Sequence, residues 1–256
     1  MFAINFATIV PIRASYADES EIMTQMLFGD TFEILETHHQ WKYIRTAYDN
    51  YEGWIDEKVV LEISQEEFYE INREQQYYTS DVLCEVVFPK SGKFMLPMGS
   101  LLPHFNPTNR SLRLGDETGE LKGNFITGKH DKMEVLKIAL SYLNAPYLWG
   151  GKTHFGLDCS GLTQMAYKMC GYNLSRNASQ QALQGENIDL KDAEAGDLAF
   201  FSNAKGKIIH VGFLIGNGQI YHSHGNAHID PIDEKGIWSN KFQRYSHQLS
   251  HVKSLM

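Results

Sequence analysis

The residues with the clearest potential for chemistry are one cysteine and two histidines in the second half of the chain. Cys159 follows a glycine-punctuated loop and begins a segment whose apolar residues recur at helical spacing until Gly171. A cysteine at a helix N-terminus faces unpaired backbone N–H groups, which favour the nucleophilic thiolate. The pattern therefore predicts a reactive Cys159 with a lowered pKa, against the alternative of a small buried core residue.

His210 and His222 are candidates for the imidazole that a catalytic cysteine needs. They flank a Gly-Asn-Gly sequence at 216–218 that predicts a hairpin. A two-residue Asn-Gly loop would place the two histidines on opposite faces of the sheet. A three-residue loop ending in a left-handed Gly218 would set His222 opposite Gly212, and both histidines would share a face. We expect the second register, because a cysteine protease needs an imidazole and a third polar group together.

Other interpretations of these histidines stay open. His224 would face His210 directly in this register and competes with His222 for the third role. His222-x-His224 with a cysteine also has donor types that bind zinc, but no further ligands are spaced as a motif. Two strand histidines satisfied by ordinary hydrogen bonds are the plainest alternative. The neighbouring Asp158-Cys159 pair favours the protease, so we expect no metal and no cofactor.

The composition limits the classes of partner. The 256 residues carry a formal net charge of −8, whereas nucleic acids and anionic membranes require a basic surface. We therefore expect no nucleic-acid and no membrane partner, and the composition says nothing of oligomeric state. Three cysteines do not indicate a disulfide framework. The N-terminus has no basic stretch before its apolar residues, so it does not read as a signal peptide and predicts a cytoplasmic protein.

Hydrophobic periodicity predicts four segments along the chain. Residues 1–62 alternate as short strands separated by turns, and residues 77–128 do the same. Between them, residues 63–76 predict a connecting helix capped by Ser64 and Glu67. Residues 129–256 mix helical and strand patterns. The predicted organisation is two small all-β barrels followed by an α+β domain.

Two stretches resemble known families. Residues 21–56, with the turn Gln25-Met-Leu-Phe-Gly-Asp30 and the ending Tyr51-Glu-Gly-Trp54, resemble the bacterial SH3-like domains found beside cell-wall hydrolases. Residues 129–224 resemble the NlpC-type papain-like peptidases of bacterial cell walls. The residues that carry this resemblance are Tyr147-x-Trp-Gly-Gly151, Asp158-Cys-Ser-Gly161, Arg176 with Gln181, Gly196-Asp-Leu198 and His210-Val-Gly212. The resemblance implies a papain-like α+β catalytic domain preceded by two SH3-like barrels.

The resemblance also implies roles for individual residues. Cys159 corresponds to the nucleophile, His210 to the general base and acid, and His222 to the orienting third member. Residues that correspond to contacts for a substrate's free N-terminal amine are Asp158, Ser160, Tyr51 and, with a looser match, Glu21. Many relatives carry a serine where this chain has Ala178.

Two further residues precede the cysteine. Tyr147 is a candidate second donor to the oxyanion, beside the Cys159 backbone N–H. Trp149 begins a glycine-rich turn that lets the backbone approach a ligand closely.

By this resemblance the protein would cleave the γ-D-glutamyl bond to a diamino acid in peptidoglycan stem peptides that have a free N-terminal L-Ala. The lack of an export signal favours a role in cell-wall recycling. A peptidoglycan-binding protein with a vestigial site is the alternative from another class. An N-acetylmuramoyl amidase or acyltransferase that uses the same cysteine is a third.

Overall fold

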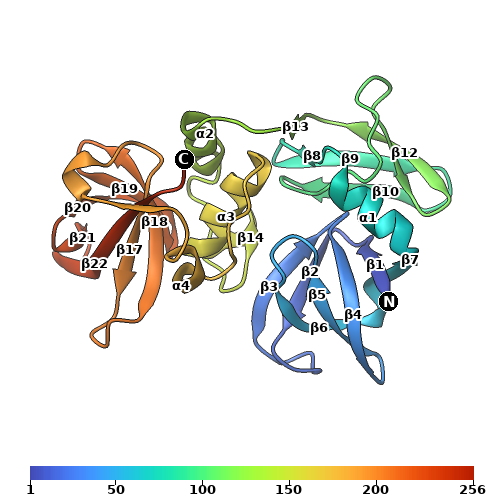
Figure 1. Cartoon of the computed structure of the whole chain (residues 1–256), viewed down its shortest axis with the longest axis horizontal. Helices are drawn as coiled ribbons and strands as arrows, with labels where there is room; N and C mark the ends of the chain where they lie inside the picture. The colour runs from blue at the N-terminus through green and yellow to red at the C-terminus, as the bar shows by residue number, and fades with distance from the viewer. The chain divides into compact units, whose positions relative to one another are not determined.

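The computed structural model describes all 256 residues of the chain. The chain divides into two compact units, Met1–Gly128 and Lys129–Met256, and both are drawn in Figure 1. None of the helices combines the length and the apolar character that crossing a membrane requires.

The first unit begins with one antiparallel sheet of seven short strands in the order β3-β2-β6-β5-β4-β1-β7. Successive side chains of a strand point to opposite faces, and the inward ones, such as Ile12, Phe32 and Ile44, form a buried apolar cluster. The short strands predicted within residues 1–62 are observed, among them β4 and β5. The strands are β1 (Phe2–Asn5), β2 (Ile9–Arg13), β3 (Ile22–Leu27), β4 (Thr31–His38), β5 (Trp41–Thr46), β6 (Glu52–Asp56) and β7 (Val60–Ile63).

The connecting helix α1 (Gln65–Arg73) starts where its capping residues predict. The Ser64 hydroxyl accepts a hydrogen bond from the Glu67 N–H at 3.0 Å, which satisfies one of the free donors of the first turn. The helix lies on β1, where Phe68 packs on Phe2 with ring centroids 4.5 Å apart. A short 3-10 turn, η1 (Glu57–Val59), precedes β7.

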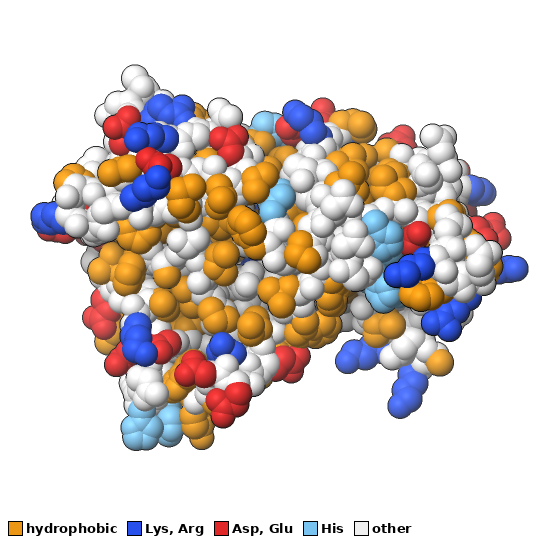
Figure 2. Space-filling model, turned by 180° about the vertical axis from the view of Figure 1, so that it is seen from behind, with side chains coloured by type: hydrophobic (Ala, Val, Ile, Leu, Met, Phe, Trp, Pro, Cys, Tyr) orange, Lys and Arg blue, Asp and Glu red, His pale blue; other side chains and the backbone are white.

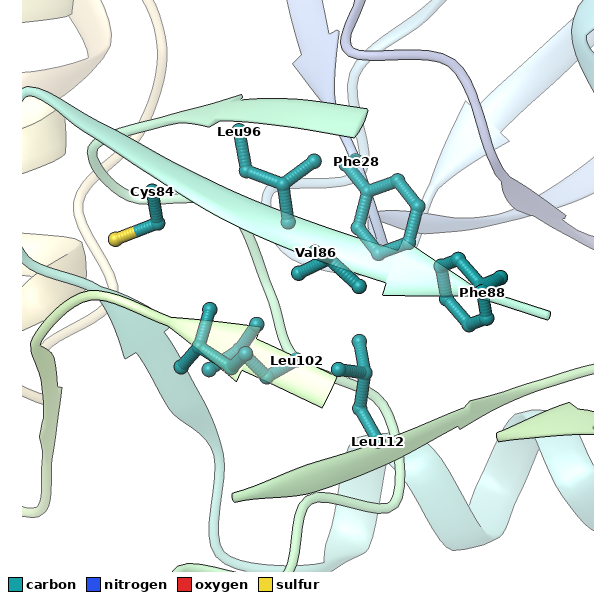
Figure 3. Close-up of a cluster of buried hydrophobic side chains, with 8 residues drawn as sticks. Phe28, Cys84, Val86, Phe88, Leu96, Leu102 and Leu112 are labelled. Carbon is teal, nitrogen blue, oxygen red and sulfur yellow. The ribbon is translucent and has the colours of Figure 1, made fainter. Parts of the chain in front are cut away.

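The rest of the first unit is a second antiparallel sheet in the order β10-β9-β12-β11, beside a separate pair of β8 and β13. Figure 3 shows its core, a buried apolar cluster that includes Val86, Leu96 and Phe28. Phe28 comes from the turn after β3, so the first sheet contributes a side chain to the core of the second. The SH3-like character of this second sheet stays a prediction. The strands are β8 (Tyr77–Thr79), β9 (Leu83–Phe88), β10 (Gly92–Pro97), β11 (Ser111–Leu114), β12 (Glu117–Lys122) and β13 (Phe125–Thr127).

The second unit combines three helices with a mostly antiparallel sheet. The helices gather on one side of the strands in Figure 1, and Tyr167 of α3 stacks on Phe213 of β18 with ring centroids 6.0 Å apart. The helices are α2 (Lys132–Ser141), α3 (Cys159–Met169) and α4 (Ala178–Gln181), with a 3-10 turn, η2 (Leu190–Asp192). The strands are β14 (Lys152–Thr153), β15 (Gly156–Leu157), β16 (Glu186–Ile188), β17 (Leu198–Ser202), β18 (Ile208–Gly216), β19 (Gln219–His224), β20 (Asn226–Asp233), β21 (Gly236–Ser239) and β22 (Arg244–Ser254).

Six strands of the second unit close into a barrel. The order is β22-β17-β18-β19-β20-β21, and β22 also pairs with β21. All six strands send apolar side chains into one buried cluster, so this face is the barrel interior; the cluster is Ala199, Phe201, Leu214, Ile220, Ile232, Ile237 and Val252. The expected combination of helices and strands is present in this unit. The papain-like α+β description is confirmed only to that extent, because strands dominate the unit and the closed barrel was not predicted.

Candidate active site

Cys159 is the first residue of α3, and a dense set of hydrogen bonds holds it there. The preceding Asp158 caps the helix by accepting from the Gly161 N–H at 2.7 Å. Its other carboxylate oxygen accepts from the Gly150 N–H at 2.8 Å, which ties the glycine-rich loop to the helix. Arg176 donates a hydrogen bond to each oxygen of the same carboxylate from its two terminal nitrogens, at 2.9 and 2.7 Å. The nucleophile candidate thus sits on a rigid support.

Ser160 and Gln181 extend this support. The Ser160 hydroxyl accepts from Arg176 at 2.9 Å and lies 3.3 Å from the Asp158 carboxylate. Gln181 of α4 donates to the Ser160 carbonyl at 3.0 Å and accepts from the Thr163 hydroxyl at 2.8 Å. Asp158 and Ser160 are therefore brought to Cys159 as expected, but both are already bonded within the protein. The Asp158 carboxylate, which the resemblance assigns to a substrate amine, already has a charged partner in Arg176.

The expectation of a lowered pKa at Cys159 is also wrong. The side chain is buried, with 6% of its surface exposed, and this burial raises the pKa of the Cys159 thiol to about 12, with the Asp158 carboxylate acting in the same direction. The nearby backbone N–H groups of Val211 and Ser160 act the other way. Loss of hydration penalises the thiolate more than the helix N-terminus stabilises it, so the resting side chain is a neutral thiol. Proximity to Val211 also places this thiol beside the β18 backbone, one residue from His210.

The hairpin that carries His210 and His222 pairs Gly212 with His222 as predicted. The turn that produces this register is not the predicted one. Gly216 pairs with Gln219, and the two residues between them, Asn217 and Gly218, both have positive φ, at 53° and 67°. This is the geometry of a two-residue type I′ turn, not the predicted three-residue loop. Gly218 does adopt the predicted positive φ.

A β-bulge restores the expected pairing. The register shifts between Leu214 and Gly216, and Gly212 lies opposite His222. One unpaired residue exchanges the faces of every later side chain, so His210 and His222 share the interior face of the barrel. Gly212 is required between them, because a Cβ at this position would lie 2.8 Å from the Cβ of His222.

His210, His222 and Asp230 form a hydrogen-bonded chain inside the barrel. His210 Nε2 lies 2.9 Å from His222 Nδ1, and His222 Nε2 lies 3.4 Å from Asp230 Oδ2. The contact with His222 lowers the pKa of Asp230, so its carboxylate accepts and His222 Nε2 carries a proton. His222 Nδ1 then accepts from His210 Nε2–H, which leaves a lone pair on His210 Nδ1. His210 is therefore hydrogen-bonded to His222, whereas His224 only meets it as a ring, with centroids 6.2 Å apart.

Further histidine side chains surround the hydrogen-bonded residues His210, His222 and Asp230. His247 stacks on His210 with ring centroids 4.1 Å apart, and His224 meets His247 edge-on at 4.8 Å. His228 lies directly opposite His222 on β20. We call the set His210, His222, His224, His228, Asp230 and His247 the polar end of the barrel.

Asp230, His228 and His247 were not predicted from the sequence, because no individual strand was expected after residue 224. A signal for two of them was present. Gly225, with φ of 82°, makes a tight turn directly after β19, and a hairpin there pairs His222 with His228 and sets Asp230 on the same face. His247 comes from β22, and no local pattern links it to the site.

The other predicted site residues are divided between the units. Tyr147 is near Cys159: burial raises the pKa of Tyr147 to about 12, and the adjacent thiol adds to the shift. Trp149 is 56% exposed in the loop before the cysteine. Glu21 and Tyr51 belong to the first unit, where Glu21 precedes β3 and Tyr51 precedes β6. On the face shown in Figure 2, Lys and Arg side chains are interspersed with Asp and Glu.

Two family models match parts of the chain. The model of the NlpC/P60 family matches residues 144–247, and that of the bacterial dipeptidyl-peptidase SH3 domain matches residues 12–59. Dipeptidyl-peptidase 6 of Lysinibacillus sphaericus is 30% identical over 262 residues, which cover 92% of this chain and 93% of that protein. Gamma-D-glutamyl-L-lysine dipeptidyl-peptidase of Bacillus subtilis is 27% identical over 236 residues, 82% of this chain and 75% of that protein.

A solved structure shares the fold along the whole chain. The crystal structure of an NlpC/P60 family protein from Bacillus cereus superposes with a TM-score of 0.84, covering 100% of this chain and 99% of that one, at 19% identity. Similarity at this level of identity describes the fold alone.

Proposed function

Because the chain belongs to the NlpC/P60 family of peptidases, we propose that it is a cysteine peptidase that hydrolyses the bond between γ-D-glutamate and a diamino acid in peptidoglycan stem peptides. Cys159 is the nucleophile, His210 the general base and His222 the residue that orients it. The observation that carries this proposal is the hydrogen-bonded chain from Asp230 through His222 to His210. These hydrogen bonds leave the lone pair of His210 on Nδ1. His210 lies on β18, the strand beside the Cys159 thiol.

The reaction begins from two neutral groups. His210 Nδ1 takes the thiol proton as Cys159 sulfur attacks the peptide carbonyl, so the thiolate exists only during attack. The resulting imidazolium is stabilised through His222 by the Asp230 carboxylate. The backbone N–H of Cys159 and the Tyr147 hydroxyl are the proposed donors to the oxyanion. Because the donors are fixed before the reaction, little reorganisation accompanies the developing charge.

Two proton transfers complete the cycle. His210 gives its proton to the leaving amine of the diamino acid, and the acyl group stays on Cys159 sulfur. The neutral His210 then takes a proton from water as this water attacks the thioester. Collapse of the second tetrahedral intermediate returns the proton to the Cys159 sulfur and releases the carboxylate product, so each group ends in its starting state.

The names of the relatives support a substrate with a free N-terminus. Two of them are dipeptidyl-peptidases, one of which is named for γ-D-glutamyl-L-lysine, and an enzyme that releases dipeptides must recognise the end of a chain. We extend this to the present protein, with L-Ala as the free first residue and cell-wall recycling in the cytoplasm as its setting. Asp158 and Ser160 serve this recognition by shaping the loop at Gly150, since Arg176 already occupies the carboxylate.

The test compares the tripeptide L-Ala-γ-D-Glu-L-Lys with its N-acetylated form, and both with the meso-diaminopimelate versions, by mass spectrometry. We expect the free peptides to give L-Ala-D-Glu and the diamino acid. Acetylation removes the charge of the N-terminal amine and with it the proposed charge-assisted hydrogen bond to the Gly150 loop, worth about 1.5–3 kcal/mol. The blocked peptides should therefore react roughly ten- to hundredfold more slowly. Equal rates for free and blocked peptides would reject the end-recognition proposal.

The same experiment decides between the alternatives. A peptidoglycan-binding protein with a vestigial site would leave every peptide intact, and the complete His210–His222–Asp230 chain speaks against it. An amidase would instead release the intact stem peptide, with L-Ala at its N-terminus, from a muropeptide added to the assay. Transfer to an added amine in place of water would identify an acyltransferase.

The pH profile of kcat/KM follows from the neutral resting pair. Burial, with the neighbouring rings of His247 and His222, lowers the pKa of His210 well below its usual value. A base with a lowered pKa stays unprotonated as the pH falls, so the acid limb should lie below about 6.5. The alkaline limb of the profile should lie near the thiol pKa of about 12. The value of kcat/KM should therefore stay constant between the two limbs. A bell centred near pH 7 would contradict the neutral pair.

A further inference from the structure

Three side chains at the polar end of the barrel have the composition of a divalent-metal site. His222, His228 and Asp230 each offer one ligand atom, and these atoms lie within 4.8 Å of one another. Two imidazoles and a carboxylate are ligands that zinc takes in sites with an open fourth position. Side-chain exposures of 29% for His228 and 14% for Asp230 give an ion a route from solvent.

The distances within this group suit a metal as well as hydrogen bonds. Asp230 Oδ2 lies 3.4 Å from His222 Nε2 and 3.1 Å from His228 Nε2. Metal–nitrogen bonds of about 2.0–2.1 Å in a tetrahedral site place neighbouring ligand atoms roughly 3.3 Å apart. The His222 contact is longer than the 2.7–2.9 Å or so typical of hydrogen bonds between charged partners. Small movements would therefore admit an ion between the three atoms.

The second nitrogen of each histidine is already held. His228 Nδ1 lies 2.8 Å from the Asn226 carbonyl, which only accepts, so this nitrogen carries a proton. A neutral His228 then presents the lone pair of Nε2 to Asp230, and two acceptors face each other unless a proton or a cation lies between them. Metal-binding histidines are commonly oriented by such a bond from the other ring nitrogen to a backbone carbonyl. His222 Nδ1 is likewise held, by His210.

We propose that His222 Nε2, His228 Nε2 and Asp230 Oδ2 form a zinc site and that occupation of this site switches the peptidase off. The binding stands on these contacts alone, whereas the inhibition rests on the function proposed above. His222 belongs to both the zinc site and the hydrogen-bonded chain, which couples the two.

The inhibition follows from proton positions. Zinc takes the Nε2 lone pair of His222, so the proton of this neutral ring moves to Nδ1. His222 then donates to His210 Nε2, which must accept, and the proton of His210 moves to Nδ1. No proton is gained or lost by the two rings, and any proton on His228 Nε2 passes to water. His210 now presents N–H instead of a lone pair toward the thiol and cannot act as its base.

Binding is tested by calorimetric titration of zinc chloride into Cys159→Ala protein, which has no reactive thiol and needs no turnover. We expect one site per chain, an affinity at least about tenfold weaker when His228→Gln is added, and an unchanged affinity when His224→Gln is added instead. His224 is the matched control, because it is a histidine of the same polar end outside the proposed ligand set. The site would be overturned if Cys159→Ala protein bound no zinc, or if His224→Gln weakened the zinc affinity as much as His228→Gln.

Inhibition is tested on chains that retain Cys159. Zinc should abolish wild-type cleavage of the free tripeptide, and EDTA should restore it. The His228→Gln variant should need at least about tenfold more zinc for half inhibition, expressed relative to its own zinc-free rate. If His228→Gln lowers calorimetric binding but leaves zinc sensitivity unchanged, the inhibition acts elsewhere and the proton-shift mechanism is rejected. If no peptide is cleaved at all, the proposed function fails while the titration still decides the site.

Discussion

Replacing Cys159 with alanine should reduce cleavage of the free tripeptide by at least about 10⁴-fold, because the acyl-enzyme cannot form without the sulfur. The fold should remain, since alanine is acceptable at a helix start and the Asp158 cap is untouched. The unfolding free energy should therefore change by no more than about 1 kcal/mol. Product formation by mass spectrometry and thermal unfolding by circular dichroism measure the two effects separately.

Cys170→Ala is the matched control, because Cys170 is a second buried cysteine at the other end of the same helix. This variant should lose some stability from its smaller side chain while keeping its rate per folded molecule. Turnover that survives in Cys159→Ala, or disappears equally in both variants, would remove Cys159 as the nucleophile.

The largest expected loss of stability comes from Arg176→Met. Arg176 and Asp158 form an ion pair whose side chains are 1% and 6% exposed, and removal of one partner from a buried pair costs about 3–5 kcal/mol. The N–H groups of Gly150 and Gly161 still bond to the orphaned carboxylate, which favours the lower part of this range. Because Asp158 also caps α3, activity should fall together with stability. Urea unfolding followed by circular dichroism gives the free-energy change directly.

The control for this prediction is an ion pair in water. Lys137 and Glu134 lie 3.1 Å apart on the surface of α2, where such pairs contribute at most about 1 kcal/mol. Lys137→Met should therefore leave the urea concentration at the midpoint of unfolding almost unchanged. Adding Asp158→Asn to Arg176→Met should recover part of the lost stability, since the uncompensated charge disappears. Equal midpoints for Arg176→Met and Lys137→Met would mean that the buried pair is not a major support of the site.

Features that depend on neighbouring residues could be predicted from the sequence. Ser64 caps α1 as predicted, because the bond joins residues three positions apart, and α3 begins at Cys159 as predicted. The common face of His210 and His222 was also predicted, and it is observed. Its cause was misjudged, because the choice between a longer turn and a bulge depends on how the strands twist against the rest of the sheet.

The electrostatics of the site came only from the tertiary structure. A helix start alone predicts a lowered pKa for Cys159, whereas burial by the packed unit raises it. Desolvation depends on everything that surrounds the thiol, including segments remote in sequence. The same holds for Asp158, whose partner Arg176 lies 18 residues further along the chain.

The members of the polar end divide in the same way. His210 and His222 were identified from the sequence, and Asp230 and His228 follow β19 through one tight turn. His247 reaches His210 only because β22 pairs with both β17 and β21 and closes the barrel. Pairing between distant strands is set by packing of whole faces and leaves no local pattern in the sequence. The sequence by itself therefore indicated Cys159, His210 and His222 as candidates for the chemistry. The tertiary structure added Asp230 and His247 and decided burial and hydrogen bonding, because both depend on segments that are remote in sequence.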